Sequence, residues 1–128
     1  MGIYLNPGNT EFQRALNSEI YVDKSLLIEY TNRIINTNMQ NICVSRPRRF
    51  GKSTDARMIA AYYDQSCDSS KLFKDLKIAK SKEYQKHLNK YNVILLNMQD
   101  FLSETHDIEK MIQLVNDSVI WELLLEYK

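Results

Sequence analysis

The sequence predicts an α/β domain in which parallel strands are flanked by helices. Two short apolar runs, 41–45 and 93–96, have the length and composition of buried strands. The stretches around and between them show helical spacing of apolar residues, and this alternation favours parallel strands. The chain has 128 residues, of which 44% are hydrophobic, so it is long enough for one domain and too short for two.

The N-terminal third is predicted to hold a turn, a helix and the first strand. Pro7-Gly8 indicates a turn. Asp23 is a candidate N-cap for a helix within residues 21–36, because the residues that follow it place an apolar stripe on one face. Strand 41–45 comes next. The stripe of the helix consists of Leu27, Tyr30 and Ile34.

The next helix, 52–64, begins directly after a loop and is predicted to face a core. Its apolar residues follow the i, i+3, i+4, i+7 pattern. Beyond strand 93–96, a long last helix is predicted from Ile108 onward. The smaller elements between these are a polar loop at 65–70, a helical turn at 71–76, a short surface helix at 81–89 and a turn at 103–107.

The loop between strand 41–45 and helix 52–64 contains the candidate functional residues of the chain. It reads Arg46-Pro-Arg-Arg-Phe-Gly51-Lys52-Ser53-Thr54. The second half matches the phosphate-binding loop G-x-x-x-x-G-K-[ST], while Arg46 stands where that pattern has its first glycine. Gly-Lys-Ser alone recurs by chance, but a strand before it and an amphipathic helix after it favour phosphate binding.

Each residue type in this loop has a physical reason to be there. Backbone N–H groups at a helix N-terminus bind phosphate, and the helix dipole favours negative charge there. Gly51 lets the backbone approach closely, Lys52 supplies an ammonium and the Ser53 hydroxyl is a Mg²⁺ ligand. The predicted ligands are therefore ATP and Mg²⁺. The phosphate contacts are assigned to Arg48, Arg49, Phe50, Gly51, Lys52, Ser53 and Thr54, and the metal contact to Ser53.

The arginines of the loop have two other interpretations, a solvated basic patch and a nucleic-acid contact. The formal net charge is only +1 and aromatic residues are not interleaved beyond Phe50. Nucleic acid is therefore not supported by this segment.

At this loop the chain resembles a known family, the predicted AAA-ATPase-like proteins. The whole string from Arg46 to Ser53 matches the loop of that family, including arginine at the first position. Further likeness extends over residues 3 to 127. It is carried by Tyr21-Val-Asp-Lys-Ser25, Leu72-Phe-Lys-Asp-Leu-Lys-Ile78 and Tyr91-Asn-Val-Ile94.

The resemblance implies a P-loop NTPase fold of the additional-strand ATPase type, usually followed by a restriction-endonuclease-like domain. Residues 1–128 then correspond to the N-terminal part of the ATPase domain, with the P-loop at 46–53 and without the Walker B half or the nuclease domain. In that fold the strand before the P-loop and the strand at 93–98 are not neighbours. We therefore expect an incomplete sheet with unpaired edges, and association with itself or with the missing half.

A Walker B carboxylate is not recognisable in this segment. Asn97 follows the second apolar run where an Asp is needed, and Asp100 comes three residues later. An amide supplies no negative charge to Mg²⁺ or to an attacking water. The expected function is nucleotide binding with little or no hydrolysis, which leaves the enzyme assignment open. The alternative is a non-catalytic, regulatory chain that binds itself or a full-length relative.

The histidines, the cysteines and the residues outside the loop are not assigned to catalysis or metal binding. His87 and His106 lack a ligand partner at metal spacing and are expected on the surface, and Cys43 and Cys67 suggest neither zinc nor a disulfide. Tyr21 and Lys24 are expected either near the nucleotide base, as the resemblance implies, or in N-terminal packing. The absence of an 18-residue apolar run or a signal peptide favours a cytoplasmic protein without membrane contact. Trp121 and the leucines after it are expected either in the core or on a surface that meets another chain.

Overall fold

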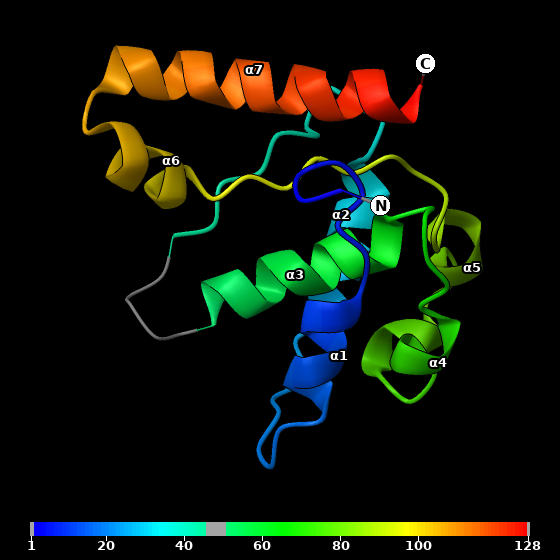
Figure 1. Ribbon diagram of the computed structural model, residues 1–128. Helices are drawn as coiled ribbons and strands as arrows, with labels where there is room; N and C mark the ends of the chain where they lie inside the picture. Colours follow the sequence, from blue (N-terminus) through cyan, green and yellow to red (C-terminus); the bar gives the residue numbers. More distant parts are fainter. Residues whose placement is uncertain (1, 46–50, 128) are drawn as a thin grey trace.

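The computed structural model describes residues 2–45 and 51–127, and the described chain is built from helices. Figure 1 shows α3 crossing the middle of the molecule, with α1 below it and α4 and α5 beyond its C-terminal end. The long α7 lies along one side together with α6. The elements are α1 (Thr10–Leu16), α2 (Leu26–Ile34), α3 (Lys52–Tyr63), α4 (Ser70–Phe73), the 3₁₀ helix η1 (Lys77–Lys80), α5 (Tyr84–His87), α6 (Met98–Thr105) and α7 (Ile108–Glu126).

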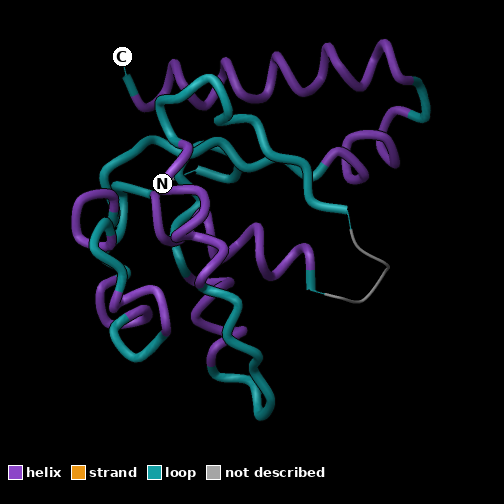
Figure 2. The backbone as a smooth tube through the Cα atoms, turned by 180° about the vertical axis from the view of Figure 1, so that it is seen from behind, coloured by secondary structure: helices purple, strands orange, loops and turns teal. Residues whose placement is uncertain are grey.

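The prediction of an α/β P-loop fold with parallel strands is wrong for this structure. Within the described residues, β-structure is limited to two isolated bridges, Leu5 with Ile94 and Asp64 with Tyr91. Figure 2 shows helix and loop and no strand along the whole described trace. The expected incomplete sheet is therefore absent from residues 2–45 and 51–127.

The first predicted strand, 41–45, does not form because no other described segment pairs with it. A strand exists only as a member of a hydrogen-bonded ladder. All five residues are exposed, and Ile42 and Val44 keep 41% and 43% of their surface in contact with solvent. The apolar run that predicted burial is thus left unburied in this structure.

The second predicted strand, 93–96, begins an antiparallel ladder with the N-terminal segment and stops after one bridge. Asn6 N–H donates to the Val93 carbonyl at 2.7 Å and Leu95 N–H donates to the Tyr4 carbonyl at 2.9 Å. Side chains take the next donors on both sides. Tyr4 N–H donates to the Glu122 carboxylate, and Val93 N–H donates to the Asn6 side-chain oxygen. Neither donor remains for a backbone carbonyl, so the ladder ends.

The core lies where α1, α2, α3, α4 and η1 meet, and aromatic rings fill much of it. Phe12 of α1 stacks on Phe73 of α4 with ring centroids 5.0 Å apart, and Tyr62 of α3 meets Phe73 edge-on at 5.6 Å. The buried cluster consists of Phe12, Ile28, Met58, Ala61, Tyr62, Tyr63, Phe73, Ile78, Tyr84 and Leu88. This core holds α3 firmly by its C-terminal half.

The two main helices before residue 64 agree with the sequence. Helix 52–64 is confirmed as α3, and helix 21–36 is confirmed with a later start as α2. Asp23 lies just ahead of α2, where its carboxylate accepts from the Ser25 and Lys77 N–H groups. Helix α1 was not predicted.

The C-terminal third holds one confirmed helix and one error. The long last helix is confirmed as α7. The predicted turn at 103–107 is wrong in part, because residues 98–105 form α6. The Asn97 side chain caps α6 by accepting from Gln99 N–H at 3.1 Å. Asn is one of the preferred N-cap residues, so this helix start could have been predicted from the sequence.

Candidate functional site

The predicted phosphate-binding segment ends where α3 begins. Gly51 is the N-cap with φ 83° and ψ 23°, a left-handed conformation that favours glycine. Asp55 N–H donates to the Gly51 carbonyl at 2.8 Å and closes the first turn. The N–H groups of Lys52, Ser53 and Thr54 belong to the first turn, where the helix contains no carbonyl four residues earlier to accept from them. They therefore point out of the N-terminal end of α3.

A cavity of about 370 Å³ lies beside this first turn. Lys52 and Ser53 form one wall, together with Ala56 and Arg57 one turn further along α3. The cavity therefore brings an ammonium, a hydroxyl and a guanidinium to the helix end whose dipole already favours an anion.

The opposite wall comes from residues 95–100, the end of the second apolar run and the start of α6. Asn97 and Asp100 line the same cavity as Lys52 and Ser53. Asn97 is occupied as the cap of α6, whereas Asp100 is an exposed carboxylate in the first turn of that helix. The tertiary structure thus places a carboxylate in the same cavity as Ser53, although Asp100 lies three residues beyond the position where the Walker B pattern requires it.

A second cavity, of about 200 Å³, lies on the other side of Gly51. Tyr21, Lys24, Thr54 and Asp55 line it together with Gly51. The Lys24 ammonium lies 3.9 Å from the Asp55 carboxylate and 3.1 Å from where a Cβ on Gly51 would stand. The segment that precedes α2 therefore lies against the start of α3.

The hydroxyl of Tyr21 is held in its neutral form at this second cavity. Burial raises its pKa to about 12, and the nearby carboxylates of Asp23 and Asp55 act in the same direction. A neutral phenol beside Lys24 offers a hydrogen-bond donor without repelling an anion.

Four predicted residues of the loop, Arg46, Arg48, Arg49 and Phe50, lie outside the described residues. Gly51, Lys52, Ser53 and Thr54 lie within them and surround one helix end, with cavities on two sides. In the part of the chain that the structure describes, no three His, Cys, Asp or Glu side chains gather where they could hold a metal ion. None of the described helices combines the length and apolar character needed to cross a membrane.

His87 is a correction, because it was expected on the surface and is buried, with 5% of its area exposed. Its Nδ1 lies 2.7 Å from the Tyr91 hydroxyl, and its Nε2 lies 3.6 Å from a Glu83 carboxylate oxygen. Sequence reasoning missed this group. The available signal was the repeated spacing of four residues among Glu83, His87 and Tyr91.

Comparison with known proteins gives one finding. The family model described as "Predicted AAA-ATPase" matches residues 8–128. No match is found among the curated proteins or among the solved structures.

Proposed function

Because this chain belongs to the family of predicted AAA-ATPases, we propose that the start of α3 binds the phosphates of a nucleoside triphosphate, with ATP as the first candidate. The observation that carries the proposal is the cavity beside this helix end. It is lined by Lys52 and Ser53, two residues of the phosphate-binding pattern, and follows a glycine at φ 83°. Backbone N–H groups at a helix N-terminus, a helix dipole and an ammonium at one place are what a polyphosphate requires.

Charge at the site favours an anion on both sides of Gly51. Lys52 and Arg57 face the larger cavity, and Lys24 lines the smaller one. The sequence adds Arg46, Arg48 and Arg49 directly before Gly51. The negative charge of Asp55 is offset by the Lys24 ammonium 3.9 Å away.

The residues present also fit Mg²⁺ as the ion that accompanies the nucleotide. Mg²⁺ takes oxygen ligands, keeps several waters and is completed by phosphate oxygens. The Ser53 hydroxyl and the Asp100 carboxylate line one cavity and are oxygen donors of this kind. Bound Mg²⁺ would neutralise phosphate charge, with Ser53 as the predicted protein ligand.

We propose nucleotide binding with little or no hydrolysis. Turnover needs a carboxylate that orients the attacking water beside the terminal phosphate. Asn97 is an amide whose oxygen already caps α6, and Asp100 is an exposed side chain on the far wall. The site therefore has positive charge and N–H donors for binding phosphate, whereas neither Asn97 nor Asp100 is positioned as the carboxylate that orients an attacking water.

Lys52→Ala tests the site. We expect a fluorescent ATP analogue with Mg²⁺ to bind the wild-type chain and to bind this variant at least about tenfold more weakly, because one charge-assisted hydrogen bond is lost. The matched control is Lys110→Ala, an exposed lysine on α7. Equal affinity in Lys52→Ala and Lys110→Ala would overturn the assignment. Phosphate release that disappears in Lys52→Ala would instead contradict the proposed lack of turnover.

A second candidate function, self-association, is favoured by the apolar surface of α7. None of its residues is fully buried, and Trp121 and Leu124 expose 63% and 60% of their area. Exposed apolar surface of this kind is typical of association sites. Light scattering after size exclusion tests it. We expect a dimer that Leu124→Glu converts to monomer while Gln113→Glu does not, and a wild-type monomer would refute the idea.

A further inference from the structure

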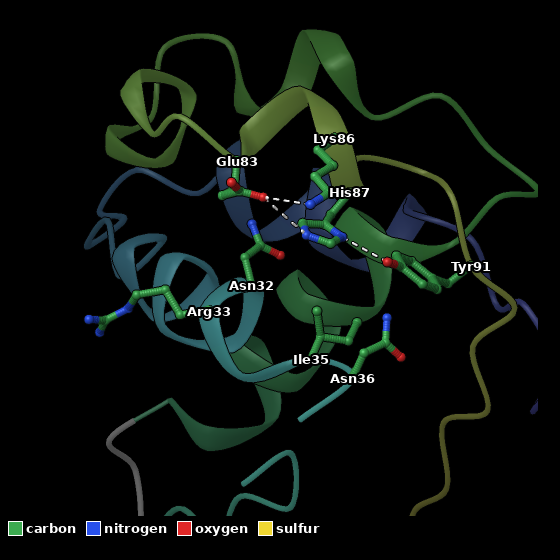
Figure 3. Close-up of a pocket in the computed structure, with 8 residues that line it drawn as sticks. All are labelled: Asn32, Arg33, Ile35, Asn36, Glu83, Lys86, His87 and Tyr91. Carbon is green, nitrogen blue, oxygen red and sulfur yellow. Dashed lines mark hydrogen bonds and ion pairs between the residues drawn. The ribbon is translucent and has the colours of Figure 1, made fainter. Parts of the chain in front are cut away.

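A cavity of about 530 Å³, remote from Lys52, is formed by residues that the nucleotide site does not use. Figure 3 shows its eight lining side chains, from α2 and the segment after it on one side and from α5 and its neighbours on the other. They are Asn32, Arg33, Ile35, Asn36, Glu83, Lys86, His87 and Tyr91. The volume falls in the usual range of small-molecule sites.

This cavity lies at the far end of α3 from the nucleotide site. Tyr63, the last residue of α3, donates to the Asn32 side chain at 2.6 Å, and its ring meets Tyr91 at 5.6 Å. Lys52 is the first residue of the same helix, eleven residues earlier, which corresponds to about 17 Å along the axis. A ligand here would not occupy the phosphate site.

Buried hydrogen bonds hold the walls of the cavity in place. Asn32 is 5% exposed, accepts from Tyr63 and donates to the Tyr62 hydroxyl at 3.0 Å. Tyr62 in turn donates to the Tyr84 carbonyl at 2.6 Å. This chain of contacts joins α2, α3 and α5, so hydrogen bonds within the core hold the buried side of the cavity in place.

The charges of the lining favour an anion. Glu83 is the one carboxylate among the eight lining residues, and it already lies 3.4 Å from the Lys86 ammonium and 3.6 Å from His87 Nε2. An incoming anion therefore meets no unshared carboxylate. An ammonium has three N–H donors, so Lys86 keeps donors for a ligand while it contacts Glu83.

The shape and the remaining surface favour an organic body attached to that anion. The His87 and Tyr91 rings are stacked with centroids 5.9 Å apart, and Ile35 offers an aliphatic side chain across the cavity. Asn36 adds an amide at the rim. Arg33 also lies at the rim, with its guanidinium over the Tyr30 ring at 5.6 Å and directed away from His87.

We propose that this cavity binds a small organic anion, a carboxylate or phosphate ester, whose charged group contacts Lys86 and whose body packs against Ile35, His87 and Tyr91. His87 is the buried reporter of occupancy. The site is independent of nucleotide binding at Lys52, so either proposal can fail without the other.

The test uses the imidazole NMR signals of the full chain. The sequence has two histidines, and His106 is exposed, so the spectrum contains one signal inside the cavity and one internal control. Phenyl phosphate and benzoate are the anionic probes, benzyl alcohol is the neutral probe of the same shape and benzylamine is the cationic one. We expect both anions to move the His87 signal saturably up to about 10 mM, with His106 unmoved.

Two variants make the result specific. Lys86→Gln is expected to weaken the anions about tenfold by removing one charge-assisted hydrogen bond, whereas Lys90→Gln, an exposed neighbour outside the cavity, keeps the wild-type affinity. Asn36→Asp adds negative charge at an exposed rim position where φ is 62°, a conformation that aspartate tolerates. It should abolish anion binding without changing the thermal melting curve.

Three results would overturn the proposal. One is the absence of a saturable His87 shift with either anion. Another is an equal or larger shift with benzyl alcohol or benzylamine. The third is unchanged anion affinity in both Lys86→Gln and Asn36→Asp. Inorganic phosphate is added in parallel, and tighter binding of phosphate than of phenyl phosphate would count against the organic body.

Discussion

Glu122 of α7 holds the N-terminal segment by three backbone hydrogen bonds, and its removal should release that segment. Its carboxylate accepts from the N–H groups of Ile3, Tyr4 and Leu5 at 2.8, 2.9 and 2.8 Å. These contacts join residues almost 120 positions apart in the chain. We predict that Glu122→Ala frees all three amides while the aromatic core stays folded.

The size of the effect follows from the number and exposure of these bonds. A hydrogen bond to a charged group contributes about 1.5–3 kcal/mol. The Ile3 contact is exposed and the other two are partly buried, so water replaces much of what is lost. We therefore expect a net loss of about 2–3 kcal/mol for the three together. This loss corresponds to about 30- to 150-fold in a local opening equilibrium.

Amide hydrogen exchange measured by NMR reports this opening residue by residue. We expect the amides of Tyr4 and Leu5 to exchange about 30- to 150-fold faster in Glu122→Ala, with core amides such as that of Tyr62 unchanged. Trp121 is the one tryptophan of the chain and lines a cavity with Ile3 and Tyr4, so its fluorescence should change as well. The matched control is Glu104→Ala, which removes an exposed carboxylate from α6.

The same contact predicts a dependence on pH. Burial raises the pKa of Glu122, but the hydrogen bonds from Leu5, Tyr4 and Ile3 outweigh it and hold the pKa below its usual value of 4.5. A pKa lowered by folding stabilises the protein above the unfolded-state pKa, and this stability is lost as pH falls through the folded-state pKa. Protection of the amides should therefore fall below about pH 4.5 in the wild type, and Glu122→Gln should flatten that fall. Exchange rates in Glu122→Ala within twofold of Glu104→Ala would refute the reasoning.

Three further substitutions probe the start of α3 and the core. Gly51→Ala places an alanine at φ 83° and should destabilise the chain by about 1–2 kcal/mol in urea unfolding while it weakens ATP binding, and an unchanged midpoint would contradict this. Phe12→Ala removes a buried ring stacked 5.0 Å from Phe73 and should cost about 3–5 kcal/mol, measured by far-UV circular dichroism. Tyr62→Phe leaves the buried Asn32 amide without its acceptor and should cost about 1–3 kcal/mol in the same assay, and a neutral result would show that water or another group replaces the hydroxyl.

The helices that the sequence predicted best are those with long, regular apolar spacing. The stripes that begin at Ala56 and Ile108 predicted α3 and α7, because helical periodicity is a local property of the chain. Helix α6 was not predicted although Asn97 is a good N-cap, because the apolar run before it is typical of a strand and the residues after it indicate a turn. Helix α1 has seven residues and one buried side chain, Phe12, which leaves little periodicity to recognise.

The strands were predicted wrongly because a strand depends on a partner that local sequence does not specify. Residues 41–45 have strand composition but lie exposed without a ladder. At residues 93–95, side-chain oxygens compete with backbone carbonyls for the N–H groups that would continue the ladder. The Glu122 carboxylate takes the Tyr4 N–H and the Asn6 amide oxygen takes the Val93 N–H.

The sequence alone identified the Gly51-Lys52-Ser53 segment and the start of its helix, because glycine at a left-handed N-cap and the residues after it are neighbours in the chain. Only the tertiary structure placed Asp100 in one cavity with Ser53, and Lys24 beside Gly51. It also buried His87 between Glu83 and Tyr91 in a cavity that Asn32 and Arg33 of α2 help to line. Motifs and helical periodicity are short-range properties, whereas cavities, ladders and buried polar contacts arise from segments that meet only when the chain folds.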